Sequence, residues 1–223
     1  MRKFISGIFL PALLLLSQTL VCGNIHSLKK DYSLRVWTSD NGLPVNSIRA
    51  IAQTSDGFIW LGTEEGLVRF DGISFFTFDP SNNPNFADKD VQSLYIFSDS
   101  SMVAGFYHGD LVSYKKLQFI RLFNRELNWI KSIQCLSEDP GKGLWFGTYG
   151  LGLGHLGYDG KMTFTTDKNG LPNDFVQAIL KDKDSSLWIG TRFGLCHLKN
   201  GVLKVYSTRD GLSYNDILSL IHI

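Results

Sequence analysis

The chain has few of the residues that would mark a disulfide-stabilised or membrane-embedded protein. Only three of its 223 residues are cysteines, and one of them, Cys22, lies within the first 23 residues. Cys135 and Cys196 stand at unrelated positions, so no disulfide framework is indicated. We expect both to be small buried apolar side chains. After residue 30 no hydrophobic run is long enough to span a bilayer.

An excess of basic charge is also missing. Lysine and arginine nearly balance aspartate and glutamate, and the formal net charge at pH 7 is +1. No cluster of Lys and Arg is longer than a pair, so the basic surface that nucleic-acid binding requires is lacking. With 43% hydrophobic and 13% aromatic residues, the composition is that of a folded globular protein. We expect no nucleic-acid partner.

Motifs for catalysis and metal binding are absent as well. The sequence has no phosphate-binding loop, zinc motif, EF-hand loop or Ser/His/Asp signature. His155 and His197 are far apart in the sequence, and we interpret them as strand residues rather than metal ligands. The sequence therefore predicts no catalytic residue, no metal site, no cofactor and no enzymatic activity of its own.

Residues 1–23 are typical of a secretory signal peptide. The basic pair Arg2 and Lys3 precedes an apolar run over residues 8–16, and we expect cleavage after Gly23. A lipoprotein signal with Cys22 as the lipidated residue is the alternative. Either signal predicts an exported protein, which we place in the periplasm.

The chain does contain one phrase, Trp-x-Gly-Thr, in three clear copies and one weaker copy. The copies span residues 60–63, 103–106, 145–148 and 188–191, and their glycines recur every 42 or 43 residues. A period of about 40–45 residues is typical of a propeller or a solenoid. Residues shared by the copies should be framework, whereas residues that differ are free to form a site. We therefore expect the three tryptophans of the phrase to pack between blades.

Each copy is predicted to fold as four short antiparallel strands. In the last complete copy, Gly170-Leu171-Pro172 is a turn, and Asn200-Gly201 joins two β-rich runs as a hairpin. No helical pattern interrupts the strands, which is typical of a propeller blade. The predicted fold class is all-β: a β-propeller of four-stranded antiparallel blades, each about 42 residues long. About four blades and the first strand of a fifth would form an incomplete ring.

The predicted domains follow from this repeat. Residues 1–23 are the signal peptide, residues 24–41 are a lead-in with an outer strand near Tyr32 to Trp37, and residues 42–223 are propeller repeats. The blades cover about residues 42–79, 87–123, 129–166, 170–208 and, in part, 211–223.

The fifth repeat is predicted from a short alignment. The segment Asn215-Asp216-Ile217-Leu218 aligns with Asn173-Asp174-Phe175-Val176, which places Ile223 inside the first strand of a fifth blade. Because an open array would expose an apolar blade face, we expect this chain to be a fragment of a longer protein.

The turn between the second and third strands differs between copies. Strand alternation places these turns and the connections between blades on one face. That rim would carry Glu64, Glu65, Tyr107, His108, Tyr149, Arg192 and Phe193. Aromatic rings with a few charges suit a sugar or peptide, so we predict a site for an oligosaccharide or another small ligand. Ordinary solvated loop residues are the alternative at each position.

Two stretches, DNGLPVNSIRAIAQTSDGFIWLGTEEGLVRFDG and NGLPNDFVQAILKDKDSSLWIGTRFGLCHL, resemble two-component regulator propeller repeats. The shared pattern is Gly-Leu-Pro, a short apolar strand, an Asp/Gly turn, Trp-x-Gly-Thr and then Gly-Leu. The resemblance extends from about residue 31 to residue 223. The second copy departs from it at Val103 and Phe106, and the third has a longer turn over residues 150–154.

The resemblance implies an extracytoplasmic sensor. Such repeats form the sensor region of membrane histidine kinases, including hybrid ones, and of some diguanylate cyclases, and several members respond to oligosaccharides. In the family a β-sandwich, a membrane helix and the kinase or cyclase follow the propellers, and the full receptor is expected to be a homodimer.

We therefore expect a non-enzymatic ligand-sensing module, with any membrane contact made through parts beyond this sequence. Two alternatives stay open: a stand-alone exported module that binds another protein, and a propeller hydrolase or lyase acting on polysaccharide.

Overall fold

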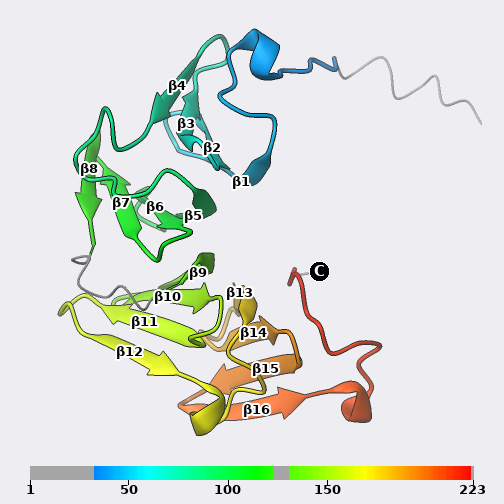
Figure 1. Ribbon diagram of the computed structural model, residues 1–223. Helices are drawn as coiled ribbons and strands as arrows, with labels where there is room; N and C mark the ends of the chain where they lie inside the picture. The colour runs from blue at the N-terminus through cyan, green and yellow to red at the C-terminus, as the bar shows by residue number, and fades with distance from the viewer. Residues whose placement is uncertain (1–32, 123–130, 222–223) are drawn as a thin grey trace, which may run out of the picture. The chain divides into compact units, whose positions relative to one another are not determined.

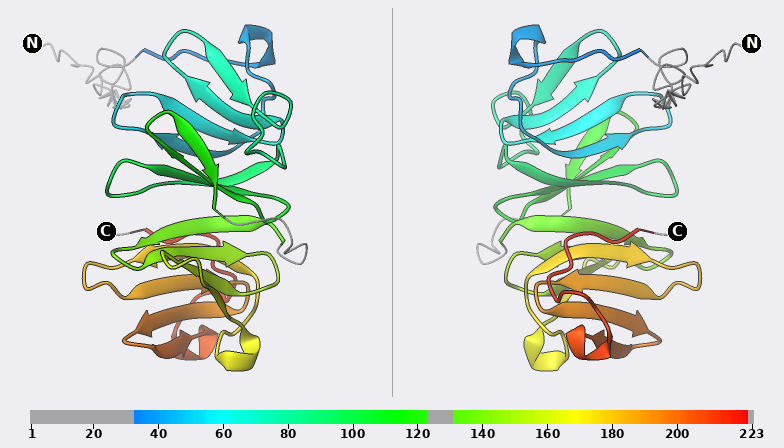
Figure 2. Two further views of the ribbon diagram at one scale, coloured as in Figure 1. Left: turned by 90° about the vertical axis from the view of Figure 1, so that its left-hand side faces the viewer. Right: turned by 90° about the vertical axis from the view of Figure 1, so that its right-hand side faces the viewer.

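The computed structural model describes residues 33–122 and 131–221. These residues form sixteen strands in four antiparallel sheets of four strands each, and within every sheet the strands lie side by side in chain order (Figures 1 and 2). The sheets confirm the predicted all-β fold with four-stranded blades. The predicted signal peptide lies outside the described residues.

The four sheets use successive parts of the sequence. The first two sheets consist of β1 (Ile48–Gln53), β2 (Ile59–Thr63), β3 (Gly66–Phe70) and β4 (Phe75–Phe78), then β5 (Val91–Ile96), β6 (Met102–Phe106), β7 (Leu111–Lys115) and β8 (Gln118–Arg121). The other two consist of β9 (Ile133–Asp139), β10 (Gly143–Thr148), β11 (Leu153–Gly157) and β12 (Met162–Thr165), then β13 (Val176–Lys181), β14 (Leu187–Thr191), β15 (Gly194–Lys199) and β16 (Val202–Tyr206). We number them as blades 1 to 4.

The turns form where the sequence supplies residues that tolerate positive φ. Asn200 (φ 51°) and Gly201 (φ 76°) join β15 to β16, as the hairpin signal predicts. A second kind of turn comes before blade 1, before blade 4 and after blade 4. These are the 3₁₀ turns η2 (Ser39–Asn41), η3 (Asp167–Asn169) and η4 (Thr208–Asp210), each closed by a left-handed glycine.

The hydrophobic core lies between consecutive sheets. One buried cluster joins blades 1 and 2, a second joins blades 2 and 3, and a third joins blades 3 and 4. Trp60 is fully buried in the first cluster, with its ring 4.8 Å from that of Tyr114, as expected for a residue that packs between blades. Trp145 and Trp188 are half-buried and pack on His155 and His197, each with ring centroids 4.2 Å apart.

The glycine of each repeated phrase packs closely against a residue at the start of the following repeat. A Cβ on Gly62 would lie 2.9 Å from the side chain of Val91, and one on Gly105 would lie 2.6 Å from Ile133. Real Cβ atoms are not found this close to a neighbour. The same relation joins Gly147 to Val176 and Gly190 to Ile217, in both cases at 2.7 Å. Glycine is therefore required at these positions because a residue at the start of the next repeat occupies the space that a Cβ atom would need.

Two expected strands are not formed. The lead-in was predicted to carry an outer strand near Tyr32 to Trp37, but its described residues 33–37 have no strand structure. The described part of the predicted fifth strand, through residue 221, also has none. In blades 1 to 4 the first strand pairs with the second strand of its own blade, and the described residues after 211 include no such partner. A single backbone hydrogen bond marks its start, from Ile217 N to Thr191 O at 3.0 Å.

The alignment of the fifth repeat is wrong by one residue. Asn215 Oδ1 accepts a hydrogen bond from Thr208 N at 2.8 Å, just as Asp174 Oδ1 accepts one from Asp167 N at 2.7 Å. Asn215 thus takes the place of Asp174, and Ile217 takes that of Val176. The sequence comparison matched the Asn-Asp pairs by residue type, whereas the structure matches residues by their bonds to the preceding turn.

Candidate functional site

The candidate rim residues stand on turns that the threonine of the repeated phrase holds in place. Thr63 Oγ1 donates to the carbonyl of Gly66 at 2.8 Å and accepts from the backbone N of Glu65 at 3.2 Å. Thr191 makes the same two bonds, to Gly194 O at 2.9 Å and from Phe193 N at 3.2 Å. Because the threonines are fully buried, these turns present their variable residues from a fixed base.

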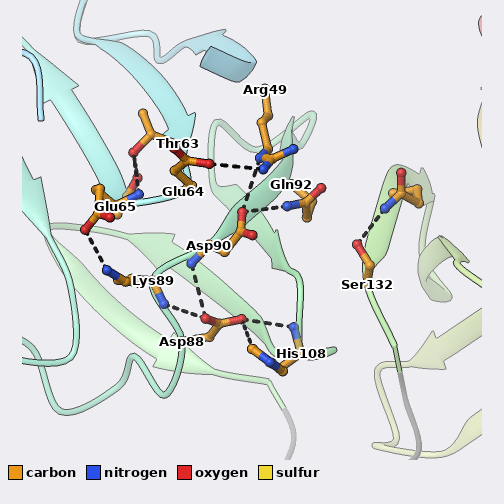
Figure 3. Close-up of polar contacts among 12 residues, drawn as sticks. Arg49, Thr63, Glu64, Glu65, Asp88, Lys89, Asp90, Gln92, His108 and Ser132 are labelled. Carbon is orange, nitrogen blue, oxygen red and sulfur yellow. Dashed lines mark hydrogen bonds and ion pairs between the residues drawn. The ribbon is translucent and has the colours of Figure 1, made fainter. Parts of the chain in front are cut away.

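Blade 2 lacks this threonine, and a buried carboxylate organises its turn instead. Asp88 accepts hydrogen bonds from the backbone N of Lys89 at 2.7 Å and from that of His108 at 2.9 Å. Its Oδ2 also lies 2.8 Å from Nδ1 of His108 (Figure 3). Asp88 therefore ties the connection before β5 to the turn after β6 and orients the imidazole of His108. The Tyr107 ring packs edge-on to that imidazole and is half-exposed.

Ion pairs link blade 1 to blade 2 on this rim. Arg49 lies 3.4 Å from Glu64 and 3.3 Å from Asp90, and Lys89 Nζ lies 2.6 Å from Glu65 (Figure 3). The hydrogen bond that Lys89 Nζ donates to the Glu65 carboxylate raises the pKa of Lys89. Glu64 and Glu65 are thus directed to separate cations, so the two adjacent carboxylates do not converge on one point.

An aromatic and cationic group occupies the equivalent position between blades 3 and 4. The Arg192 guanidinium lies 4.7 Å from the centre of the Phe175 ring and 5.0 Å from that of Tyr149. It also donates to the Tyr149 hydroxyl at 3.2 Å, and the two rings meet edge to face at 4.5 Å. Phe193, the next residue, stays 62% exposed. Arg192 is therefore held by cation–π contacts and a hydrogen bond, while Phe193 is free to contact a ligand.

The structure brings the seven predicted residues together in two groups. Glu64, Glu65, Tyr107 and His108 belong to the rim of blades 1 and 2, whereas Tyr149, Arg192 and Phe193 belong to the rim of blades 3 and 4. In the described ranges no hydrogen bond, ion pair or ring contact joins the two groups.

Sequence reasoning missed the partners of these residues, namely Arg49, Asp88, Lys89, Asp90 and Phe175. All five lie just before the first strand of a blade or at its second position. We expected the connections between blades on this rim. Aligning the start of the first strand in each repeat could therefore have identified these five residues.

Neither a metal centre nor a membrane helix is seen in the part of the chain that the structure describes. No group of three or more metal-binding side chains is assembled among residues 33–122 and 131–221. In the same residues no helix is long and apolar enough to cross a bilayer.

Comparison with known proteins agrees with the fold. Residues 42–65 and 170–193 match the family described as two component regulator propeller. These segments hold the Gly-Leu-Pro and Trp-x-Gly-Thr phrases of blades 1 and 4. No curated protein matches the sequence significantly.

Several solved structures share the arrangement of blades. The extracellular domain of the hybrid two component system BT3049 from B. thetaiotaomicron is 25% identical, with a TM-score of 0.66 over 77% of this chain and 26% of that one. That of BT4673 from the same organism is 21% identical, with a TM-score of 0.64 over 78% of this chain and 24% of that one. The chain thus spans about a quarter of the length of either structure.

An enzyme also shares the fold. Virginiamycin B lyase from Staphylococcus aureus is 17% identical, with a TM-score of 0.57 over 75% of this chain and 56% of that one. At this identity the likeness shows the fold alone, because one fold serves many functions.

Proposed function

We propose that this chain, which carries two component regulator propeller repeats, is part of the extracytoplasmic ligand-sensing propeller of a two-component receptor. The observation that carries the proposal is the match of residues 42–65 and 170–193 to that repeat family. The likeness to the extracellular domain of a hybrid two component system supports it. Export to the periplasm follows from the same proposal and from the signal-like residues 1–23.

The rim residues would supply ligand recognition. They differ between blades, whereas the tryptophan, glycine and threonine of the repeated phrase are used in packing and turn formation. Tyr149 and Phe193 are exposed aromatic rings beside a fixed guanidinium, and such a surface can cover the apolar faces of a sugar. An oligosaccharide or another small polar ligand is therefore the proposed class.

The proposed mechanism is a shift of conformational population. A ligand held on the rim favours whichever packing of two receptor subunits binds it more tightly, and the shift cannot exceed that difference in affinity. The chain itself contributes binding and no chemistry. Any kinase or cyclase activity would belong to other parts of a full-length receptor.

The hydrolase alternative gains little from the structure. Glycoside hydrolysis needs two carboxyl groups that flank one bond. Glu64 and Glu65 are instead engaged by Arg49 and by Lys89, in different directions (Figure 3). A stand-alone module that binds another exported protein is the other alternative, and it would require no response to a sugar.

An in-frame deletion of codons 42–221 in the organism that carries this sequence tests the proposal. Transcripts are compared during growth on single polysaccharides. We expect one polysaccharide to lose the ability to induce its set of genes. Unchanged induction on every polysaccharide would contradict the sensor role. The matched control is Tyr158→Ala, an exposed aromatic residue in the β11–β12 turn, which should leave induction intact.

A further inference from the structure

Blade 4 and the start of the fifth repeat enclose a depression on the rim that the sequence did not single out. Its lining includes Gln177, Arg192, Phe193, Tyr214, Asn215 and Asp216. Only Arg192 and Phe193 belong to the predicted site. The other four residues come from the second position of β13 and from the segment after η4.

The depression arises because two equivalent positions carry different residues between blades 3 and 4 and between blade 4 and the fifth repeat. Between blades 3 and 4, the turn residue Tyr149 packs its ring against Phe175 and fills the space. At the next junction the same two positions hold Arg192 and Asp216. Arg192 turns back onto the rings of Tyr149 and Phe175 and does not fill the space beside Asp216.

The polar groups of the depression are fixed in position. Gln177 Nε2 donates to Oδ1 of Asp216, and this bond joins blade 4 to the fifth repeat. Asn215 Oδ1 accepts from the backbone N of Thr208 at 2.8 Å, which leaves its amide nitrogen as the donor group of that side chain. One carboxylate and two amides thus offer both donors and acceptors to a ligand.

Two aromatic rings border these polar groups. Phe193 is 62% exposed and Tyr214 is 72% exposed. Exposed rings next to a small set of fixed hydrogen-bonding groups are the usual composition of a carbohydrate site, because sugar rings have apolar faces and hydroxyl edges. The charges of Arg192 and Asp216 balance, which favours a neutral ligand over an acidic or basic one.

We propose that this depression binds a neutral oligosaccharide, with Phe193 and Tyr214 stacking on sugar rings and with Gln177, Asn215 and Asp216 binding hydroxyl groups. This inference rests on the proposed sensor function and names the place and ligand class of its site. It makes Tyr214 and Asp216, which lie outside the seven predicted residues, part of the recognition surface.

The test is calorimetric titration of the purified full chain with hexasaccharides of glucose, xylose and mannose, and with hexagalacturonate as an acidic probe. We expect at least one neutral hexasaccharide to bind. Phe193→Ala and Tyr214→Ala should each weaken that binding about 10-fold, the loss of one stacked ring. Tyr158→Ala, whose ring is similarly exposed in another turn, should bind as the unmodified chain does. Urea unfolding midpoints confirm that each variant is folded.

The outcomes separate this inference from the sensor proposal. Binding that neither aromatic variant weakens would overturn the assigned site and leave the sensor role standing. Binding of hexagalacturonate alone would overturn the neutral ligand class. If the unmodified chain binds no hexasaccharide, the inference is wrong, and the sensor role is then judged by the deletion experiment alone.

Discussion

Ile217 lies against Gly190, with its Cγ2 atom 2.7 Å from the point that a Cβ on that glycine would occupy. Val176 and Gly147 stand in the same relation one blade earlier. A backbone hydrogen bond from Ile217 N to Thr191 O accompanies the contact. The glycine of the repeated phrase therefore specifies how one blade stacks on the next.

Gly105→Ala should destabilise the protein by about 1–3 kcal/mol, because its methyl group would overlap Ile133 and Ser93 in a packed core. Urea unfolding of the full chain measures the effect. The double variant Gly105→Ala/Ile133→Ala should lose less stability than the two single changes together, since removing the Ile133 side chain relieves the overlap. An unchanged midpoint for Gly105→Ala would refute the stacking role.

Trp60→Ala should cost about 3–5 kcal/mol, the usual range for a large aromatic side chain removed from a core. The indole Nε1 of Trp60 donates to Thr54 Oγ1 at 3.0 Å in a buried environment. Thr54→Val leaves that donor without its acceptor and should cost about 1–3 kcal/mol. Chemical denaturation followed by tryptophan fluorescence gives both values. A cost below 1 kcal/mol for Trp60→Ala, roughly that of an ordinary surface change, would place this tryptophan outside the core.

Arg49→Ala should change stability by less than about 1 kcal/mol, because its ion pairs with Glu64 and Asp90 are partly exposed to solvent. The small loss should shrink further at high salt, which screens such pairs. Thermal unfolding at low and high ionic strength checks this. A loss as large as that of Gly105→Ala would mean that the rim charges are framework rather than a surface free to vary.

Cys196 is buried, as predicted, whereas Cys135 is half-buried, and both should resist alkylation in the folded protein. Burial raises the pKa of Cys135 and of Cys196 to about 12, from an ordinary value of 9.0. The protonated thiol is thus favoured in the folded state, and this contribution to stability is complete below pH 9.0. It is lost as the pH rises from 9.0 toward 12, where the unfolded chain releases its thiol protons first.

Iodoacetamide labelling at mildly alkaline pH should therefore be slow without urea and fast with it. Equal rates in the two conditions would show that the thiols are accessible. In the Cys135→Ala/Cys196→Ala variant the loss of stability above pH 9.0 should be smaller than in the unmodified chain.

Much of the fold could be predicted from the sequence because the determinants are local and repeated. The glycine period and the Asn200-Gly201 hairpin depend on residues close together in the chain. The strand near Tyr32 to Trp37 was predicted from its likeness to the last strand of each repeat, but the described residues 33–37 form no strand. The predicted alignment of Ile217 was also wrong. Its position is determined by the hydrogen bond between Asn215 and the preceding turn, which residue types do not reveal.

The site was less predictable than the fold. Glu64, Glu65 and Arg192 were selected because they differ between copies, but the residues that hold them come from elsewhere in the chain. Lys89 is 24 residues from Glu65, and Tyr149 is 43 residues from Arg192. Such residues come together only when neighbouring blades stack, and comparing the repeats within the sequence does not show which residues of neighbouring blades are in contact.

The central claim is that recognition depends on rim residues that vary between blades. The most direct measurement places Phe193→Ala and Tyr214→Ala together in the chromosomal gene and records transcripts on single polysaccharides, with protein abundance measured in parallel. The account predicts normal abundance and loss of induction by one neutral polysaccharide. Normal abundance with full induction by every polysaccharide would contradict it.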